Sequence, residues 1–122
     1  MKIKQKQAID AYREVRKLET QDMDGSQAIM LFALREAMEP QFRFQDEQEH
    51  KYSKMLNCPI GLDGTISFPD AETRRKYLDK MDELAEIEVE LNWELKRFNI
   101  NGIRISMKGI EALRTVLEIV CE

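Results

Sequence analysis

The 122-residue sequence predicts an α+β, mainly α domain: a long helical hairpin with a short β-hairpin or small antiparallel sheet and a C-terminal helix. Three observations predict this class. Apolar residues recur every three to four positions in the first half, Asp-Gly and Asn-Gly pairs mark tight turns, and residues 86–95 alternate between polar and apolar. A chain of this length buries about two-thirds of its unfolded surface, so one domain over residues 1–122 is expected.

The first half of the chain contains two stretches with helical periodicity. Residues 4–21 are expected to form an amphipathic helix, whose apolar stripe needs a partner surface and consists of Ala8, Tyr12, Val15 and Leu18. Asp24 or Ser26 can accept hydrogen bonds from the free N–H groups that open a second helix near Gln27. This second helix continues with Ile29, Leu31, Phe32, Leu34 and Met38.

Pro40 interrupts the second helical stretch. Proline has no N–H group and its ring collides with the preceding turn, so we expect either a kink or a helix that restarts with Pro40 in its first turn. The apolar pattern then resumes with Phe42, Tyr52, Met55 and Leu56. Because residues 45–51 contain no apolar side chain, this part of the helix is expected to project past the core.

The second half of the chain mixes turns, extended segments and helices. Residues 58–68, around Asp63-Gly64, are expected to form a short β-hairpin or an extended loop. Asp70 can cap a third helix, whose apolar residues are Tyr77, Leu78, Met81 and Leu84. An Asn101-Gly102 turn predicts a second hairpin. Ser106 can cap a last helix, with one side formed by Ile110, Leu113, Val116, Leu117 and Val120.

The alternating segment 86–95 is the most distinctive feature. A period of two favours a strand with one buried and one solvated face, although glutamate and leucine both favour helix, which stays the alternative. As a strand, it places glutamates about 7 Å apart on one face. We predict an acidic strip that binds a partner, formed by Asp82, Glu83, Glu86, Glu88, Glu90 and Glu94. Its charges either keep an exposed sheet from pairing edge to edge or attract a basic surface.

The charge distribution and the cysteines limit the partners and the compartment. Net charge is −4, but residues 1–20 hold six Lys and Arg against three Asp and Glu, whereas the remainder holds 13 against 20. This basic head has only Tyr12 to stack on bases, so nucleic-acid binding is not expected. Two isolated cysteines and the lack of a leader favour a cytoplasmic protein, and no apolar run approaches the ~20 residues of a membrane span.

No group of residues predicts a catalytic, metal or cofactor site. His50 lies four residues after Asp46, but two ligands are too few for a zinc site. Asp22, Asp24 and Ser26 resemble the start of a calcium loop that then lacks its glycine and its final glutamate. Neither a nucleophile–base spacing nor a glycine-rich phosphate loop is present. We therefore expect no enzyme and no cofactor.

Several short motifs follow one another along the chain. The first is the N-terminal helix at Ala8–Leu18, followed by a Glu-Pro step at Glu39-Pro40. An Asp-Gly turn at Asp63-Gly64 then precedes a Pro-capped helix. The last two are a Glu-Val-Glu-Leu segment at Glu88–Leu91 and an Ile-Ser pair, Ile105-Ser106, at the start of the closing helix. In this order the chain resembles a family of small uncharacterised proteins from phages and prophages of Gram-positive bacteria. The resemblance implies a phage or prophage origin and no known activity.

The sequence favours a non-enzymatic protein-interaction module, phage-encoded, that builds or chaperones an assembly and forms a homo-oligomer. A large exposed apolar patch near residues 29–34 would support this function. The alternative is a phage inhibitor of a host defence or nucleic-acid-handling protein, whose basic site the acidic strip occupies. The expected partner is a protein, either a second copy of the chain or a basic host protein.

Overall fold

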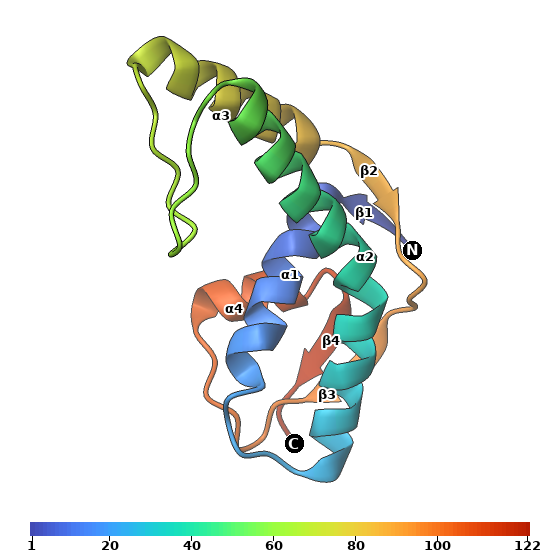
Figure 1. Ribbon diagram of the computed structural model, residues 1–122. Coiled ribbons are helices and arrows are strands. Elements are labelled where there is room, and N and C mark those ends of the chain that lie inside the picture. The colour runs from blue at the N-terminus through green and yellow to red at the C-terminus, as the bar shows by residue number, and fades with distance from the viewer.

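Four helices and four short strands make up the fold, and the computed structural model describes all 122 residues (Figure 1). In chain order the elements are β1 (Lys2–Lys4), α1 (Gln5–Leu18), α2 (Gly25–Met55), α3 (Ala71–Ala85), β2 (Glu88–Glu90), β3 (Lys96–Asn99), α4 (Met107–Leu113) and β4 (Leu117–Val120). Helix α1 lies at the centre and contacts α2, α3, α4 and β1. The predicted class, α+β and mainly α with a long helix pair, is confirmed.

The core forms around α1 because its apolar stripe is almost fully buried. All four predicted stripe residues are buried, and the small side chains of Ala8 and Ala11 let neighbouring elements approach closely. Tyr12 stacks on Phe42 of α2, with ring centroids 4.3 Å apart. The other elements contribute the rest of the core: Ile3, Leu31, Leu34, Met38, Leu91, Trp93, Phe98, Ile103, Leu113, Val116 and Leu117.

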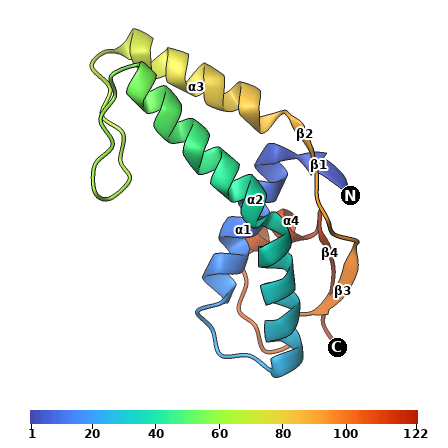
Figure 2. The ribbon, with the colours of Figure 1, turned by 45° about the vertical axis from the view of Figure 1, so that its right-hand side comes forward.

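Helix α2 runs without interruption from Gly25 to Met55, with Pro40 in its interior. Asp24 caps its first turn, since its carboxylate accepts a hydrogen bond of 2.8 Å from the Gln27 N–H. Figure 2 shows that the axis of α2 bends between its two halves, as expected where proline removes a backbone hydrogen bond. The kink predicted at Pro40 is confirmed, and the alternative of a restarted helix is excluded.

The second half of α2 and the whole of α3 form an arm that projects from the core (Figure 2). The polar residues 45–51 lie in this arm, as predicted. Its packing is thin: beyond Met38, α2 buries only Ser53, and α3 buries only Tyr77 and Leu84. The arm therefore depends on few apolar contacts.

The loop between α2 and α3 is an irregular hairpin. Gly64 has a φ of 82°, which suits the predicted turn, and Ile60 and Ile66 form a single antiparallel bridge. Phe68 packs against Tyr77 of α3, with ring centroids 5.5 Å apart. Burial raises the pKa of Tyr77 to about 12. The loop thus packs back onto the arm.

The first strand pair joins the N-terminus to the alternating segment. β1, which the sequence did not predict, pairs antiparallel with β2. The strand expected over residues 86–94 is confirmed only at Glu88–Glu90, because Glu86 is the C-cap that ends α3. Beyond β2 the alternation of buried and exposed residues continues, since Leu91 and Trp93 are buried. A helix through this whole segment is excluded.

The second strand pair contradicts the predicted second hairpin. β3 pairs in parallel with β4, which follows α4 in the chain. The expected turn does form, with Gly102 at a φ of 80°. The Ile103 N–H then donates to the Ile100 carbonyl, and the chain enters α4 instead of returning along β3.

The predicted C-terminal helix is too long. Ser106 caps α4 as expected, since its hydroxyl accepts a hydrogen bond from the Gly109 N–H, but the helix ends at Leu113. The rest of the predicted apolar side lies in or beside β4, at Val116, Leu117 and Val120. β-Branched residues favour a strand there, and β3 supplies backbone partners for it.

The buried side-chain amide of Gln27 connects α2 to the end of β3 by hydrogen bonds. Gln27 is 7% exposed, and its Nε2 donates to the carbonyls of Asn99 at 2.8 Å and Asn101 at 2.9 Å. Its Oε1 accepts from the Asp24 N–H at 3.2 Å. Both amide N–H groups are used, so this contact stabilises the orientation in which the face with Leu31 and Leu34 points inward.

Replacing Gln27 by glutamate should lower the free energy of unfolding by about 2–4 kcal/mol, because a carboxylate would face two carbonyls that lose their donor. Urea unfolding followed by the fluorescence of Trp93, the single tryptophan, measures this loss. Gln48→Glu is the matched control, since Gln48 lies in the same helix without a side-chain hydrogen bond. It should change stability by less than about 0.5 kcal/mol. Equal losses would contradict the role of Gln27.

The arm should open before the rest of the protein. We expect the amides of residues 45–55 and 71–80 to exchange with deuterium at least about tenfold faster than those of α1, because few buried contacts hold the arm closed. Hydrogen–deuterium exchange read by mass spectrometry on the intact protein tests this. Equal protection of α1 and the arm would show that the two unfold as one unit.

Candidate functional site

The predicted acidic strip is spread over three successive elements. Two of its carboxylates lie in α3, one caps the end of α3, two lie in β2 and one follows in the extended segment: Asp82, Glu83, Glu86, Glu88, Glu90 and Glu94. All six are exposed. They are close along the chain, but they do not share one strand face.

The basic N-terminal segment compensates part of this acidic strip. The ammonium groups of Lys4 and Lys6 lie 2.7 and 2.9 Å from the carboxylate oxygens of Glu86. The N-terminal ammonium of Met1 lies 3.0 Å from Oε1 of Glu90. Hydrogen bonds from Lys4 and Lys6 lower the pKa of Glu86 to about 2, and Glu86 in turn raises the pKa of Lys6. The basic N-terminal segment therefore neutralises Glu86 and Glu90, two of the six carboxylates.

Half of the carboxylates of the strip stay available to another molecule. Glu83 lies 3.5 Å from Lys80 on α3. Only three of the six carboxylates make no ion pair within the chain: Asp82, Glu88 and Glu94. A partner attracted by charge would meet these three, and salt would screen most of the attraction.

A second surface lies on the first half of α2, where six apolar residues follow one another from Ile29 to Leu34. Such a run surrounds the helix, so one face cannot hold all of it. Leu31 and Leu34 are buried, whereas Ile29 and Phe32 are 72% and 55% exposed. The last two are three residues apart and lie on the same outer side. They form an exposed apolar pair in the first turns of α2.

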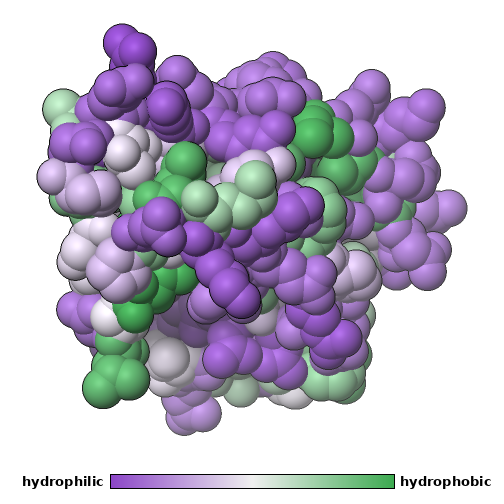
Figure 3. Space-filling view, turned by 45° about the horizontal axis from the view of Figure 1, so that its top comes forward, coloured by the Kyte–Doolittle hydropathy of each residue, from purple (hydrophilic) through white to green (hydrophobic).

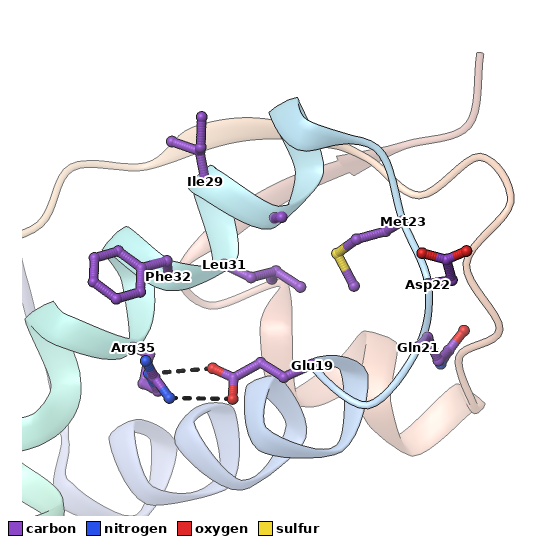
Figure 4. Close-up of a pocket in the computed structure, with 9 residues that line it drawn as sticks. Glu19, Gln21, Asp22, Met23, Ile29, Leu31, Phe32 and Arg35 are labelled. Atoms are coloured by element: carbon purple, nitrogen blue, oxygen red, sulfur yellow. Dashed lines mark hydrogen bonds and ion pairs between the residues drawn. The ribbon is translucent and has the colours of Figure 1, made fainter.

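A hollow of about 470 Å³ adjoins this pair, between the end of α1, the following loop and the start of α2. Figure 4 shows Leu31 and Met23 pointing toward one another across it, while Ile29 points away from α1. The hollow is lined by Glu19, Gln21, Asp22, Met23, Ala28, Ile29, Leu31, Phe32 and Arg35.

One ion pair closes a side of the hollow. Arg35 holds Glu19 through two contacts of 3.2 Å (Figure 4). Its guanidinium also lies 5.4 Å from the centre of the Phe32 ring. Both charged side chains are about three-quarters buried, so this pair holds its geometry better than a fully exposed one. The Arg35 guanidinium thus lies over one side of the exposed Phe32 ring.

A further hollow lies on the other side of Ile29. It measures about 540 Å³ and is bounded by Ser26, Met30, Ala33 and Lys96 together with Ile29 itself. The Ile29 side chain therefore protrudes between the two hollows. We call Ile29, Phe32 and the two hollows the α2 face.

Other parts of the surface offer less specific chemistry. A hollow between α1 and α4 is lined by charges of both signs, with one apolar residue among ten. No three His, Cys, Asp or Glu side chains cluster as metal ligands; Nδ1 of His50 lies 2.8 Å from the carbonyl of Asp46 in its own helix. None of the helices has the length and apolar character that crossing a bilayer demands. On the face drawn in Figure 3, hydrophobic residues lie in separate groups among hydrophilic ones.

Comparisons with protein-family models, with curated proteins and with solved structures found no match to this chain.

The sequence indicated the apolar run but not which of its residues face outward. Leu31, Leu34 and Met38 share one helical face with Gln27, and this spacing could have placed Ile29 and Phe32 on the opposite side. The contributions of Met23, Glu19 and Arg35 depend on how α1 and α2 pack. No local sequence signal predicts them.

The ion pairs of Glu86 predict a pH-dependent contribution to stability. The carboxylate has a pKa of about 2 when folded and an ordinary value of 4.5, so its contribution is complete above pH 4.5 and is lost as the pH falls toward 2. Glu86→Gln should therefore be less stable than the wild type at about pH 6 and should match it near pH 2.

Urea unfolding at several pH values, read by tryptophan fluorescence, measures this difference. Glu88→Gln is the control, because Glu88 makes no ion pair, and its difference from wild type should vary little with pH. A constant difference for Glu86→Gln across the same range would contradict the pairing.

Proposed function

We propose that the protein is a non-enzymatic interaction module that binds another protein through the α2 face and acts within a protein assembly. The observation that carries this function is the exposed pair Ile29 and Phe32 on the outer side of α2, between two hollows. Monomers commonly expose single apolar residues, but a contiguous apolar ridge beside concave surface is typical of an interface.

The chemistry of the α2 face fits protein recognition. Burying an Ile and a Phe side chain contributes about 1.5–3 kcal/mol each, enough to dominate a small interface. The Arg35 guanidinium beside the Phe32 ring favours one ring position, which lowers the side-chain entropy lost on binding. The edge of the α2 face is polar and includes Gln21, Asp22 and Ser26, and protein interfaces commonly combine an apolar centre with such a polar rim.

The acidic strip has less support as a binding surface. Inhibition of a basic host protein needs a concentrated negative field, and Lys4, Lys6 and the N-terminal ammonium already neutralise two of its carboxylates. Binding through the strip should weaken strongly with salt, whereas binding through an apolar face should not.

Site-specific photo-cross-linking tests the proposed function. A benzophenone amino acid in place of Phe32 should cross-link to protein in the cells that produce this chain, because the α2 face is covered there. The same amino acid in place of Leu62, which is fully exposed on the loop of the arm, should not. Ile29→Asp in the same chain should reduce the cross-link at least about tenfold.

Circular dichroism of the Ile29→Asp chain checks that the helices are retained. Equal cross-linking from both positions, or none from position 32, would contradict a binding role for the α2 face. Loss of the cross-link on Glu88→Lys with Glu94→Lys, but not on Ile29→Asp, would favour the acidic strip.

A further inference from the structure

We propose that the protein covering the α2 face is a second copy of this chain, paired through two antiparallel α2 helices related by a two-fold axis. This inference rests on the proposed function and names its partner. Three features support it: an apolar centre with hollows on both sides, small residues that allow close approach, and unpaired charges at matching positions.

The apolar centre is complementary to itself. In an antiparallel pair with its axis near residue 31, Ile29 of one copy lies opposite Ala33 of the other. The hollow beside Ala33 and Met30 can then receive the Ile29 side chain of the partner copy, and the symmetry repeats the contact. Phe32 of each copy lies next to this contact on the same outer side. Each copy thus supplies both a ridge and a hollow.

Small residues allow the two helices to approach. Gly25, Ala28 and Ala33 are all exposed on the first three turns of α2. A Cβ atom added at Gly25 would meet nothing within 4 Å, so the space above it is open. The two helices can therefore approach closely at these small residues, while Ile29 and Phe32 occupy the space between them.

Charge complementarity favours a second copy over an unrelated partner. Glu36 lies one turn beyond Phe32, is exposed, and makes no ion pair within the chain. Lys96 lies at the rim of the hollow near Ser26 and makes no ion pair either; its ammonium lies 5.0 Å from the Trp93 ring. Both groups lack an opposite charge in the isolated chain.

The antiparallel arrangement supplies that charge. About the same axis, position 36 of one copy lies opposite position 26 of the other, which is the end of α2 where Lys96 lies. Each Glu36 would meet the Lys96 of the other copy, twice per dimer. A parallel arrangement would instead place the two Glu36 side chains against each other.

The experiment is analytical ultracentrifugation of the full chain from about 1 µM to about 1 mM at low salt. The wild type should form dimers, and Phe32→Glu should be monomeric. Glu36→Lys and Lys96→Glu should each raise the dimer dissociation constant at least about tenfold, because two like-charged pairs replace two opposite ones. Glu47→Lys, farther along the exposed side of α2, is the control and should dimerise like the wild type.

Mixing the two charge variants gives the decisive result. A Glu36→Lys chain and a Lys96→Glu chain together restore both opposite-charge pairs, so the equimolar mixture should form heterodimers with about the wild-type affinity. This outcome does not depend on the folding of any apolar variant. Failure of the mixture to recover, or a wild type that stays monomeric to about 1 mM, would overturn the proposal.

The two proposals fail differently. If the wild type is monomeric while the photo-cross-linker at position 32 captures a different protein, the second-copy inference is wrong and the binding role of the α2 face stands. If the position-32 cross-linker captures nothing and the protein is monomeric, both are wrong.

Discussion

The constraint on which the surface depends is that a helix can bury only one face. Six consecutive apolar residues, from Ile29 to Leu34, surround α2, so part of the run must meet solvent or another protein. The hydrogen bonds of Gln27 to the end of β3 lie on the same face of α2 as the buried Leu31 and Leu34 and stabilise the rotation that turns this face inward. Ile29 and Phe32 are left outside by the same geometry. The apolar surface is therefore a consequence of how the core is fixed.

Charge pairing within the chain separates the two candidate surfaces. The basic N-terminus and the acidic segment after α3 are far apart in sequence, but the β1–β2 pair brings them together. These ion pairs neutralise Glu86 and Glu90 and so weaken the attraction of the acidic strip for an outside partner. On the α2 face, by contrast, Ile29 and Phe32 stay exposed, and the nearby Glu36 and Lys96 make no ion pair within the chain. This difference is the physical reason to favour apolar recognition.

Local signals predicted the helical hairpin, the caps at Asp24, Asp70 and Ser106, the kink at Pro40 and the projecting arm. Local signals do not predict strands whose pairing partners are distant in sequence. The three residues of β1 are too few to show a two-residue period. The apolar spacing of β4 fits a helix as well as a strand, so the sequence predicts a helix there. The outward orientation of Ile29 depends on tertiary packing for the same reason. The phage resemblance stays a prediction, since no comparison found a relative.

Hydroxyl-radical footprinting of the protein inside its cell, compared with dilute purified protein, measures whether the α2 face is covered. We predict that Ile29 and Phe32 are protected in the cell and oxidised in the dilute sample, while Leu62 and Met107, which are also exposed, are oxidised in both. Oxidation of Ile29 and Phe32 to the same extent in both samples would show that nothing binds this face, and would contradict its role as an interface.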